Sequence, residues 1–242
     1  MALNINSPLG NYRNYQGNMK SVGESTKKLS SGYRINSAGD DAAGLAISQK
    51  MRTQITSDQA QIRNAHDEIN FSQTGDGALA SVHSSLNRMR ELAAQASNGT
   101  YTDADRAMLQ QEFSQLQTEV GRVYEGTNFN GTEVLSDMPD LSGFDIGTQD
   151  AAMAAVDGLE AAINTVSGQR SDFGAQQNRA AYTVDGLMNE QINTQDAESE
   201  IRDLDIALAV MENTKKKILS QSSQFMLAQA NQRASGVMGL LG

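Results

Sequence analysis

The residues whose side chains do chemistry most often are few and widely separated in this sequence. The chain has two histidines, His66 and His83, and no cysteine, which excludes disulfides and thiolate chemistry. Neither histidine has a second His or a Glu at the spacing that places two metal ligands on one helix face. We therefore expect no metal site and no cofactor.

Paired carboxylates are the other candidate for catalysis. Three pairs of aspartates lie close enough in sequence to act as an acid and a base: Asp40/Asp41, Asp103/Asp105 and Asp203/Asp205. Helix caps and solvated helix faces explain these pairs better, because Asp favours the N-cap and the first turn of a helix. A nucleophile-elbow motif and a phosphate-binding glycine loop are both absent from the sequence. The sequence therefore predicts a protein that is not an enzyme.

The net charge of −10 is unevenly distributed. Residues 1–39 and 213–242 each carry a net +4, so residues 40–212 carry −18. The only basic run is Lys215–Lys217, and no predicted helix combines a basic stripe with stacking aromatics, so we expect no nucleic-acid partner. The longest apolar run, Ile206–Met211, is far shorter than the roughly 18 residues of a membrane helix, so we expect no membrane partner.

Long helices are the elements that must position these side chains. Apolar residues recur at alternating spacings of three and four along most of the chain, which is the pattern of helices packed along seams. The predicted fold class is mainly α: an elongated antiparallel helical bundle or coiled coil with a small β-hairpin region. Turn-forming residues crowd into residues 126–150, where Thr132–Leu135 and Phe144–Ile146 are candidates for pairing as the hairpin.

Helix ends are also predicted. Asp40 and Asp41 stand where a new helix needs an N-cap, the helix that follows is expected to stop at Asn98–Thr100, and the next to start at Thr102 or Asp103. Between them, Thr74–Gly77 shifts the apolar repeat, which rewinds a coiled coil locally rather than ending it.

Both ends of the chain carry an apolar stripe that is too narrow to bury itself alone. Isolated helices of this length are marginal in water. We therefore expect residues 1–39 and 206–242 to form a terminal coiled-coil domain that pairs with itself and with neighbouring molecules, and residues 40–205 to form a helical rod domain. Arg90 joins the predicted contacts because an acidic middle must meet arginines of neighbouring copies. The predicted polymer interface consists of Tyr12, Tyr15, Met19, Val22, Leu29, Tyr33, Arg90, Leu208, Met211, Ile218, Phe225, Leu240 and Leu241.

Two signatures at opposite ends of the chain resemble a known family. The run Leu29–Ile47 (LSSGYRINSAGDDAAGLAI) resembles the N-terminal signature of bacterial flagellins. Leu227–Gln232 (LAQANQ), followed by the Leu240–Leu241 ending, resembles their C-terminal signature. In flagellins a variable outer domain follows a motif like Asn128–Gly131 (NFNG). Here only residues 132–150 separate this motif from the helix predicted to resume near Ala151, so the resemblance implies a short form without that domain.

The resemblance implies a function and a set of partners. It implies a structural subunit that is exported unfolded through the flagellar type III pathway and self-assembles into the helical tube of the extracellular flagellum for motility. The implied partners are copies of itself, the flagellar cap and hook-associated proteins, and an export chaperone at the C-terminus. A hook–filament junction protein of the same superfamily and a secreted coiled-coil binding or effector protein are the alternatives; the Leu227–Gln232 match favours flagellin.

A further implied partner is the flagellin-sensing Toll-like receptor. The helix Leu86–Gln95 resembles the segment that this receptor binds in flagellins, and Arg88, Leu92 and Glu112 occupy the matching positions. The alternative for Arg88 and Glu112 is a charge pair between neighbouring helices or subunits. The sequence also departs from the family pattern, because Glu198 and Glu200 stand where arginines are expected.

Overall fold

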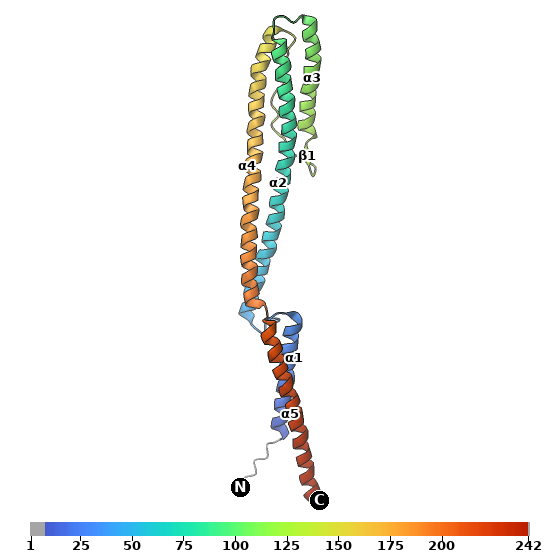
Figure 1. Cartoon of the computed structure of the whole chain (residues 1–242), viewed down its shortest axis with the longest axis vertical. Coiled ribbons are helices and arrows are strands. Elements are labelled where there is room, and N and C mark those ends of the chain that lie inside the picture. The colour runs from blue at the N-terminus through green and yellow to red at the C-terminus, as the bar shows by residue number, and fades with distance from the viewer. Residues whose placement is uncertain (1–7, 242) are drawn as a thin grey trace. The chain divides into compact units, whose positions relative to one another are not determined.

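The computed structural model describes residues 8–241 and the side chains of residues 10–232 and 235. The helices are α1 (Pro8–Ser31), α2 (Ala42–Ala96), α3 (Asp103–Gly126), α4 (Gln149–Arg202) and α5 (Ile206–Leu241), and the strands are β1 (Asn128–Phe129) and β2 (Thr132–Glu133) (Figure 1). The prediction of a mainly helical fold with a small hairpin region is confirmed.

The chain folds as two compact units. One consists of Met1–Thr56 with Gln191–Gly242, and the other of Ser57–Glu190. The division falls inside α2 and inside α4, so two long helices each contribute to both units.

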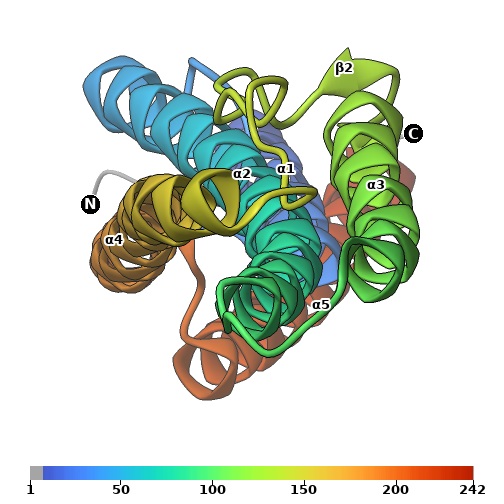
Figure 2. The same ribbon diagram turned by 90° about the horizontal axis from the view of Figure 1, so that it is seen from above.

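The unit Ser57–Glu190 is a bundle of α3 and the inner parts of α2 and α4. Within it, α2 lies between α3 and α4 (Figures 1 and 2). The predicted stripe of α2 is buried at every position, from Leu79 to Ala96, and packs against Phe113 and Val120 of α3 and against Leu159 of α4. This core is continuous and belongs to the unit alone.

Gly75 marks a close approach between α2 and α4. A Cβ atom at this position would lie 2.7 Å from Cζ of Phe173 and 3.0 Å from Cγ1 of Val134. Helix α2 runs without a break through Thr74–Gly77, as the shifted apolar repeat predicts.

A buried arginine organises the turn between α2 and α3. Helix α3 starts at Asp103 behind the N-cap Thr102, whose side chain accepts from the amide of Asp105 while the Asp105 carboxylate accepts from the amide of Thr102. Arg106 is 7% exposed and donates to the carbonyl oxygens of Ala96, at 2.9 Å, and of Asn98, at 3.2 Å. It thereby satisfies carbonyls at the end of α2 that have no partner within the helix.

Replacing Arg106 with Met is expected to lower the free energy of unfolding by about 2–4 kcal/mol, because the two carbonyls lose charge-assisted hydrogen bonds. Urea titration followed by circular dichroism measures this. The matched control is Arg122→Met, on the same helix, because Arg122 is 69% exposed and pairs only with Glu119 one turn away. Equal losses in the two variants would contradict the role given to Arg106.

The hairpin forms around Asn130 and Gly131. Both residues have positive φ, 51° and 80°, which suits the two-residue Asn-Gly turn that closes antiparallel strands. Asn128 pairs with Glu133, and Phe129 with Thr132. The prediction that Thr132–Leu135 pairs with Phe144–Ile146 is wrong: the tight turn favours the nearest partners, whereas Leu135 and Ile146 are buried in the core.

The segment between α1 and α2 is a defined joint. Gly32 ends α1 with φ 74°, and its amide donates to the carbonyl of Lys28 at 2.9 Å. Asp41 caps α2, as predicted, by accepting from the amide of Gly44 at 2.9 Å. Tyr33 pairs with Asp203 in a β-bridge, and the amide of Leu204 donates to the carbonyl of Gly32 at 3.0 Å. The joint is therefore tied to the link between α4 and α5.

Charged side chains complete this joint. The guanidinium of Arg202 lies 4.1 Å from the centre of the Tyr33 ring. Glu198 accepts from the fully buried hydroxyl of Ser48 at 3.1 Å and pairs with Arg202 at 3.4 Å. The acid at 198, a departure from the family pattern, therefore has a cation four residues away on the same helix.

Asp40 stabilises the loop of the joint in a pH-dependent manner. Hydrogen bonds from the Ser37 hydroxyl and from the amides of Asn36 and Ser37 lower the pKa of Asp40 below its ordinary value of 3.8. Because the folded-state pKa is depressed, this stabilisation is fully present above pH 3.8 and is lost as the pH falls further.

Candidate functional site

The pair formed by α1 and α5 is the candidate site, because it is built unlike a core. The two helices lie side by side and antiparallel (Figure 1): Thr26 faces Asn213, and Asn18 faces Ser223. The least exposed positions of α5 recur at spacings of four and three, which defines a coiled-coil seam. These seam residues are Ala209, Asn213, Lys216, Ser220, Ser223, Leu227 and Ala230.

Side-chain hydrogen bonds cross this seam. Nδ2 of Asn213 donates to Oγ1 of Thr26 at 3.2 Å, and Nδ2 of Asn18 donates to Oγ of Ser223 at 2.9 Å. The hydroxyl of Ser220 lies 3.2 Å from Sδ of Met19. Small and polar residues therefore fill much of the α5 side of the seam, and the pair buries little large apolar surface between its own helices.

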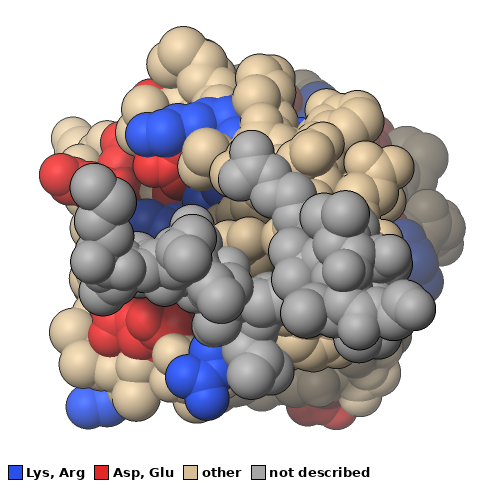
Figure 3. Space-filling view, turned by 90° about the horizontal axis from the view of Figure 1, so that it is seen from below, with Lys and Arg blue, Asp and Glu red and all other residues tan. Residues whose placement is uncertain are grey.

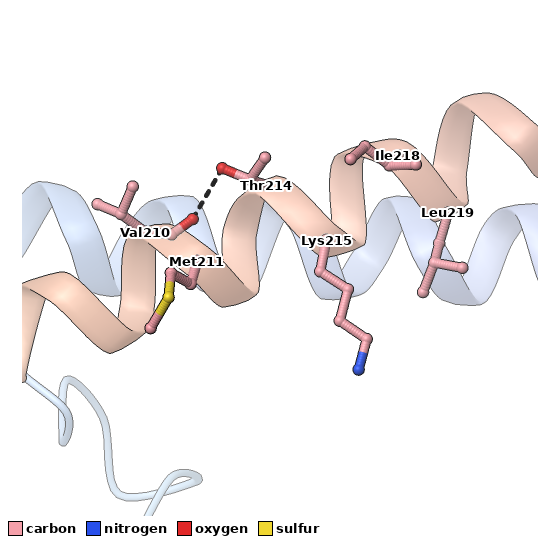
Figure 4. Close-up of a pocket in the computed structure, with 6 residues that line it drawn as sticks. All are labelled: Val210, Met211, Thr214, Lys215, Ile218 and Leu219. Atoms are coloured by element: carbon pink, nitrogen blue, oxygen red, sulfur yellow. Dashed lines mark hydrogen bonds between the residues drawn. The ribbon is translucent and has the colours of Figure 1, made fainter.

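The large apolar residues of α5 lie on its outside. Met211, Ile218 and Phe225, spaced seven apart on the side opposite the seam, are 63%, 57% and 77% exposed. Val210, Met211, Thr214, Lys215, Ile218 and Leu219 line a shallow apolar groove, in which the Thr214 hydroxyl donates to the carbonyl of Val210 at 2.9 Å (Figure 4). An exposed apolar stripe of this length marks an interaction surface.

Side chains of both signs appear among uncharged ones on the visible part of the face seen from below (Figure 3). No helix in residues 8–241 is long and apolar enough to cross a membrane.

The residues predicted for the polymer interface divide between two places. Tyr15, Val22, Leu29 and Tyr33 are partly buried within the unit. The exposed members are Tyr12, Met19, Arg90, Leu208, Met211, Ile218 and Phe225. Leu240 and Leu241 lie outside the residues whose side chains are described. Asn18, Asn213 and Ser220 are absent from the prediction, although their spacing beside the apolar residues was a signal that marks them as seam positions.

The residues matched to receptor recognition lie where α2 meets α3. Nη2 of Arg88 lies 2.8 Å from Oε1 of Glu112, and its Nη1 lies 3.1 Å from Glu91. These hydrogen bonds, with Glu112 first, raise the pKa of Arg88. The charge pair between neighbouring helices, the alternative reading, is thus present within the subunit. Leu92 is 1% exposed and belongs to the core, so it offers no surface in the folded unit.

The histidines lie apart from any ligand cluster. Nδ1 of His83 lies 2.9 Å from the side-chain nitrogen of Asn87. Across the residues that the structure describes, no three side chains of the His, Cys, Asp or Glu type converge in a way that suits a metal ion.

A helical unit with its own core, and a helix pair that exposes its large apolar residues, define a mainly helical protein. The sequence matches the bacterial flagellin N-terminal helical region over residues 4–139 and the bacterial flagellin C-terminal helical region over residues 156–241. The chain belongs to the bacterial flagellin family.

Curated relatives agree with this family, and one solved structure shares the fold. The flagellin of Halalkalibacterium halodurans is 43% identical, with all of both chains covered. Flagellin FlaB1 of Treponema pallidum is 38% identical over 91% of this chain and 92% of the relative. A Vibrio parahaemolyticus structure described as a flagellar hook-associated protein matches with a TM-score of 0.53 and 14% identity, over 68% of this chain and 100% of that one; this likeness shows the fold alone.

The family decides among the functions left open by the sequence. The chain is a structural subunit of the extracellular flagellar filament, it associates with copies of itself, and it is not an enzyme. Because a flagellin matches over the whole chain, the alternatives of a hook–filament junction protein and a secreted effector are not favoured.

Proposed function

We propose that the subunits of this filament join through the outer faces of α1 and α5. The observation that carries this proposal is the exposure of Met211, Ile218 and Phe225 on the side of α5 that faces away from its seam. Tyr12 and Met19 of α1, each 49% exposed, extend the same kind of surface. These positions belong to the interface predicted from the sequence.

Energetics support this assignment. Full burial of a Met, Ile or Phe side chain contributes about 1.5–3 kcal/mol each, whereas the Ala and Ser residues of the α5 seam contribute much less. The pair therefore gains most of its apolar burial only when other copies cover it. Ordering the two helices costs conformational entropy, and contacts between subunits offset that cost.

The test places a charge in the centre of the outer face. Ile218→Glu is expected to reduce the pelleted fraction in seeded sedimentation at least about tenfold, because a carboxylate left without a partner costs several kcal/mol at an interface. Gln224→Glu is the matched control, since it adds the same charge at an exposed position near the seam side of the same helix. Normal filament yield from Ile218→Glu would overturn the proposal. Unchanged circular dichroism of the monomer excludes misfolding.

The two parts of the chain are assigned different roles in the filament. Residues 1–39 with 206–242 act as the assembly domain, and residues 40–205 act as the rod. Arg90, exposed on α2, pairs with acids of neighbouring copies, since residues 40–212 carry a net −18 and repel one another when stacked.

Family membership supports a proposal of further partners. The chain is exported unfolded through the flagellar type III pathway, is held beforehand by a chaperone at its C-terminus, and adds to a filament that begins at hook-associated proteins and ends at a cap protein. The apolar groove on α5 (Figure 4) supports the chaperone proposal, because free subunits expose it. Co-purification of the chain with such a chaperone, lost in Ile218→Glu, tests it.

Recognition by the flagellin-sensing Toll-like receptor rests on Arg88 and Glu112, both of which are exposed at the α2–α3 junction. Leu92 acts from within the core and holds the two helices in place. Arg88→Ala is expected to weaken binding of the receptor ectodomain; unchanged binding in a pull-down would remove Arg88 from the proposal.

A further inference from the structure

Two asparagines stand at seam positions of the α1–α5 pair where an apolar residue would bury more surface. Asn213 is 5% exposed, and its amide donates to Thr26 at 3.2 Å. Asn18 is half-buried. Its amide donates to the hydroxyl of Ser223 at 2.9 Å and, at 3.4 Å, to the carbonyl of Leu219. Both bonds cross from one helix to the other, eight residues apart on α1 and ten apart on α5.

Small residues make up much of the α5 seam. Ala209, Ser220 and Ser223 are small, and a shift by one heptad, about 10 Å along the helix, would in one direction exchange Ser223 for Ala230. Knobs of this size give little shape specificity, in contrast to Leu or Ile. The bond from the amide of Leu204 to the carbonyl of Gly32 anchors one end of the pair, and farther along the helices the polar bonds across the seam are what can hold the alignment.

The asparagine bonds fail in the neighbouring registers. A shift by one heptad in one direction would set Asn213 against Met19 and Asn18 against Lys216. A shift in the other direction would set Asn18 against Ala230 and would carry Asn213 past the end of α1 at Ser31. Neither arrangement repeats an amide-to-hydroxyl bond at both levels, and an amide buried without a partner is costly.

We propose that Asn18 and Asn213 are positioning residues that fix the register of the antiparallel α1–α5 pair, and that this register composes the surface offered to the next copy of the chain. The proposal rests on the outer faces of α1 and α5 being the assembly surface. A buried Asn that sets alignment at some cost in stability is a known device of coiled coils.

Register matters because the outer surface draws on both helices. In the observed alignment, Sδ of Met19 lies 3.2 Å from the hydroxyl of Ser220, which places Met19 level with Ile218 and its neighbours on α5. A shift by one heptad would move the exposed residues of α1 relative to those of α5, so a neighbouring copy would contact a surface of different shape. The asparagines thus select among shapes rather than strengthen the pair.

The experiment measures register directly in the full chain. Since the chain has no cysteine, Lys27→Cys and Lys217→Cys, both exposed, carry a pair of spin labels for distance measurement by pulsed electron resonance. Labelled subunits are copolymerised at a few per cent with unlabelled wild type, so that only the distance within a subunit is read. The test variant combines Asn18→Leu with Asn213→Leu, and the rescue variant exchanges one pair, Thr26→Asn with Asn213→Thr.

The expected result is a single distance in the wild type and the exchange variant. For the leucine variant we expect either a second distance, produced by an axial displacement of the helices by about 10 Å, or an about tenfold lower incorporation into filaments. Monomer helicity should equal or exceed that of the wild type. A leucine variant that incorporates normally with the single wild-type distance would overturn the proposal. An exchange variant as defective as the leucine variant would also overturn it, because the hydrogen bond would then not be the cause.

The test of the register can be distinguished from the test of the assembly surface. If Ile218→Glu assembles normally, the outer face is not the interface, whatever the labels show. If Ile218→Glu fails while the leucine variant keeps both its incorporation and its single distance, the interface stands and only the register assignment falls.

Discussion

Removing residues 213–242 should leave a helical, monomeric protein that cannot polymerise. The deletion takes away most of α5, including Ile218 and Phe225, and leaves α1 without the partners of Thr26 and Asn18. The unit Ser57–Glu190 keeps its whole core, which draws only on α2, α3, α4 and the loop between α3 and α4. Circular dichroism is expected to show nearly the same helical signal per residue for residues 40–205, and seeded sedimentation is expected to yield no pellet.

Two results would each contradict a different part of this argument. Outright unfolding of the truncated chain would mean that the terminal helices support the rod. Continued assembly would mean that the rod drives polymer formation by itself and that the joint at Leu29–Ile47 does not separate two functions. Full-length protein carrying Gln224→Glu serves as the assembly-competent control, since this change leaves the outer face of α5 intact.

Spacing rules predicted the helices and the rod core well, because both depend on local pattern. The stripe from Leu79 to Ala96 is buried at each predicted position, and the capping residues Asp41 and Thr102 start the helices that they were expected to start. These features follow from side-chain periodicity and from the unpaired amides of a helix N-terminus, which depend little on distant contacts.

The pairing of the hairpin strands and the residues of the terminal seam could not be predicted from apolar periodicity alone. The hairpin is determined by the tight turn that the positive φ of Asn130 and Gly131 allows. The more apolar segment Phe144–Ile146 does not pair in it, because Ile146 is buried in the core. At the ends of the chain, the search for apolar stripes placed seam residues such as Tyr15 and outward residues such as Met211 in one interface. Which face of a helix turns inward is a matter of competition: here Asn213 faces the partner helix, and the larger Met211 remains exposed.

The structural role of Arg106 could not be predicted from the pattern of apolar residues. A charged side chain in the first turns of a helix is normally read as solvated, and burial of an arginine is rare unless it is paired. Its role becomes evident only when the end of α2 is brought within reach, because its guanidinium then donates to the carbonyls of Ala96 and Asn98. Contacts between helix ends are set by the turn geometry and not by the periodicity of either helix.

The largest loss of stability is expected from Phe113→Ala. Phe113 is fully buried, lies in the middle of α3, and belongs to the single core of the unit Ser57–Glu190. Truncation of a buried Phe to Ala removes its apolar burial and leaves a cavity, which together cost about 3–5 kcal/mol. That cost is a large part of the roughly 5–15 kcal/mol that stabilises a typical domain, so a lower urea midpoint and a partly unfolded population at moderate temperature are expected.

The matched control is Met108→Ala, a change of an apolar residue on the same helix that is 64% exposed; it is expected to alter the free energy of unfolding by no more than about 0.5 kcal/mol. Because the core belongs to one unit, the loss in Phe113→Ala should appear in the rod and leave cross-seam bonds such as Asn213 to Thr26 available to form. Spin labels at positions 27 and 217 in dilute copolymers then report an unchanged distance at temperatures where the variant rod is still folded. A Phe113→Ala protein as stable as Met108→Ala would mean that α3 contributes little to the rod and that α2 and α4 hold it together without α3.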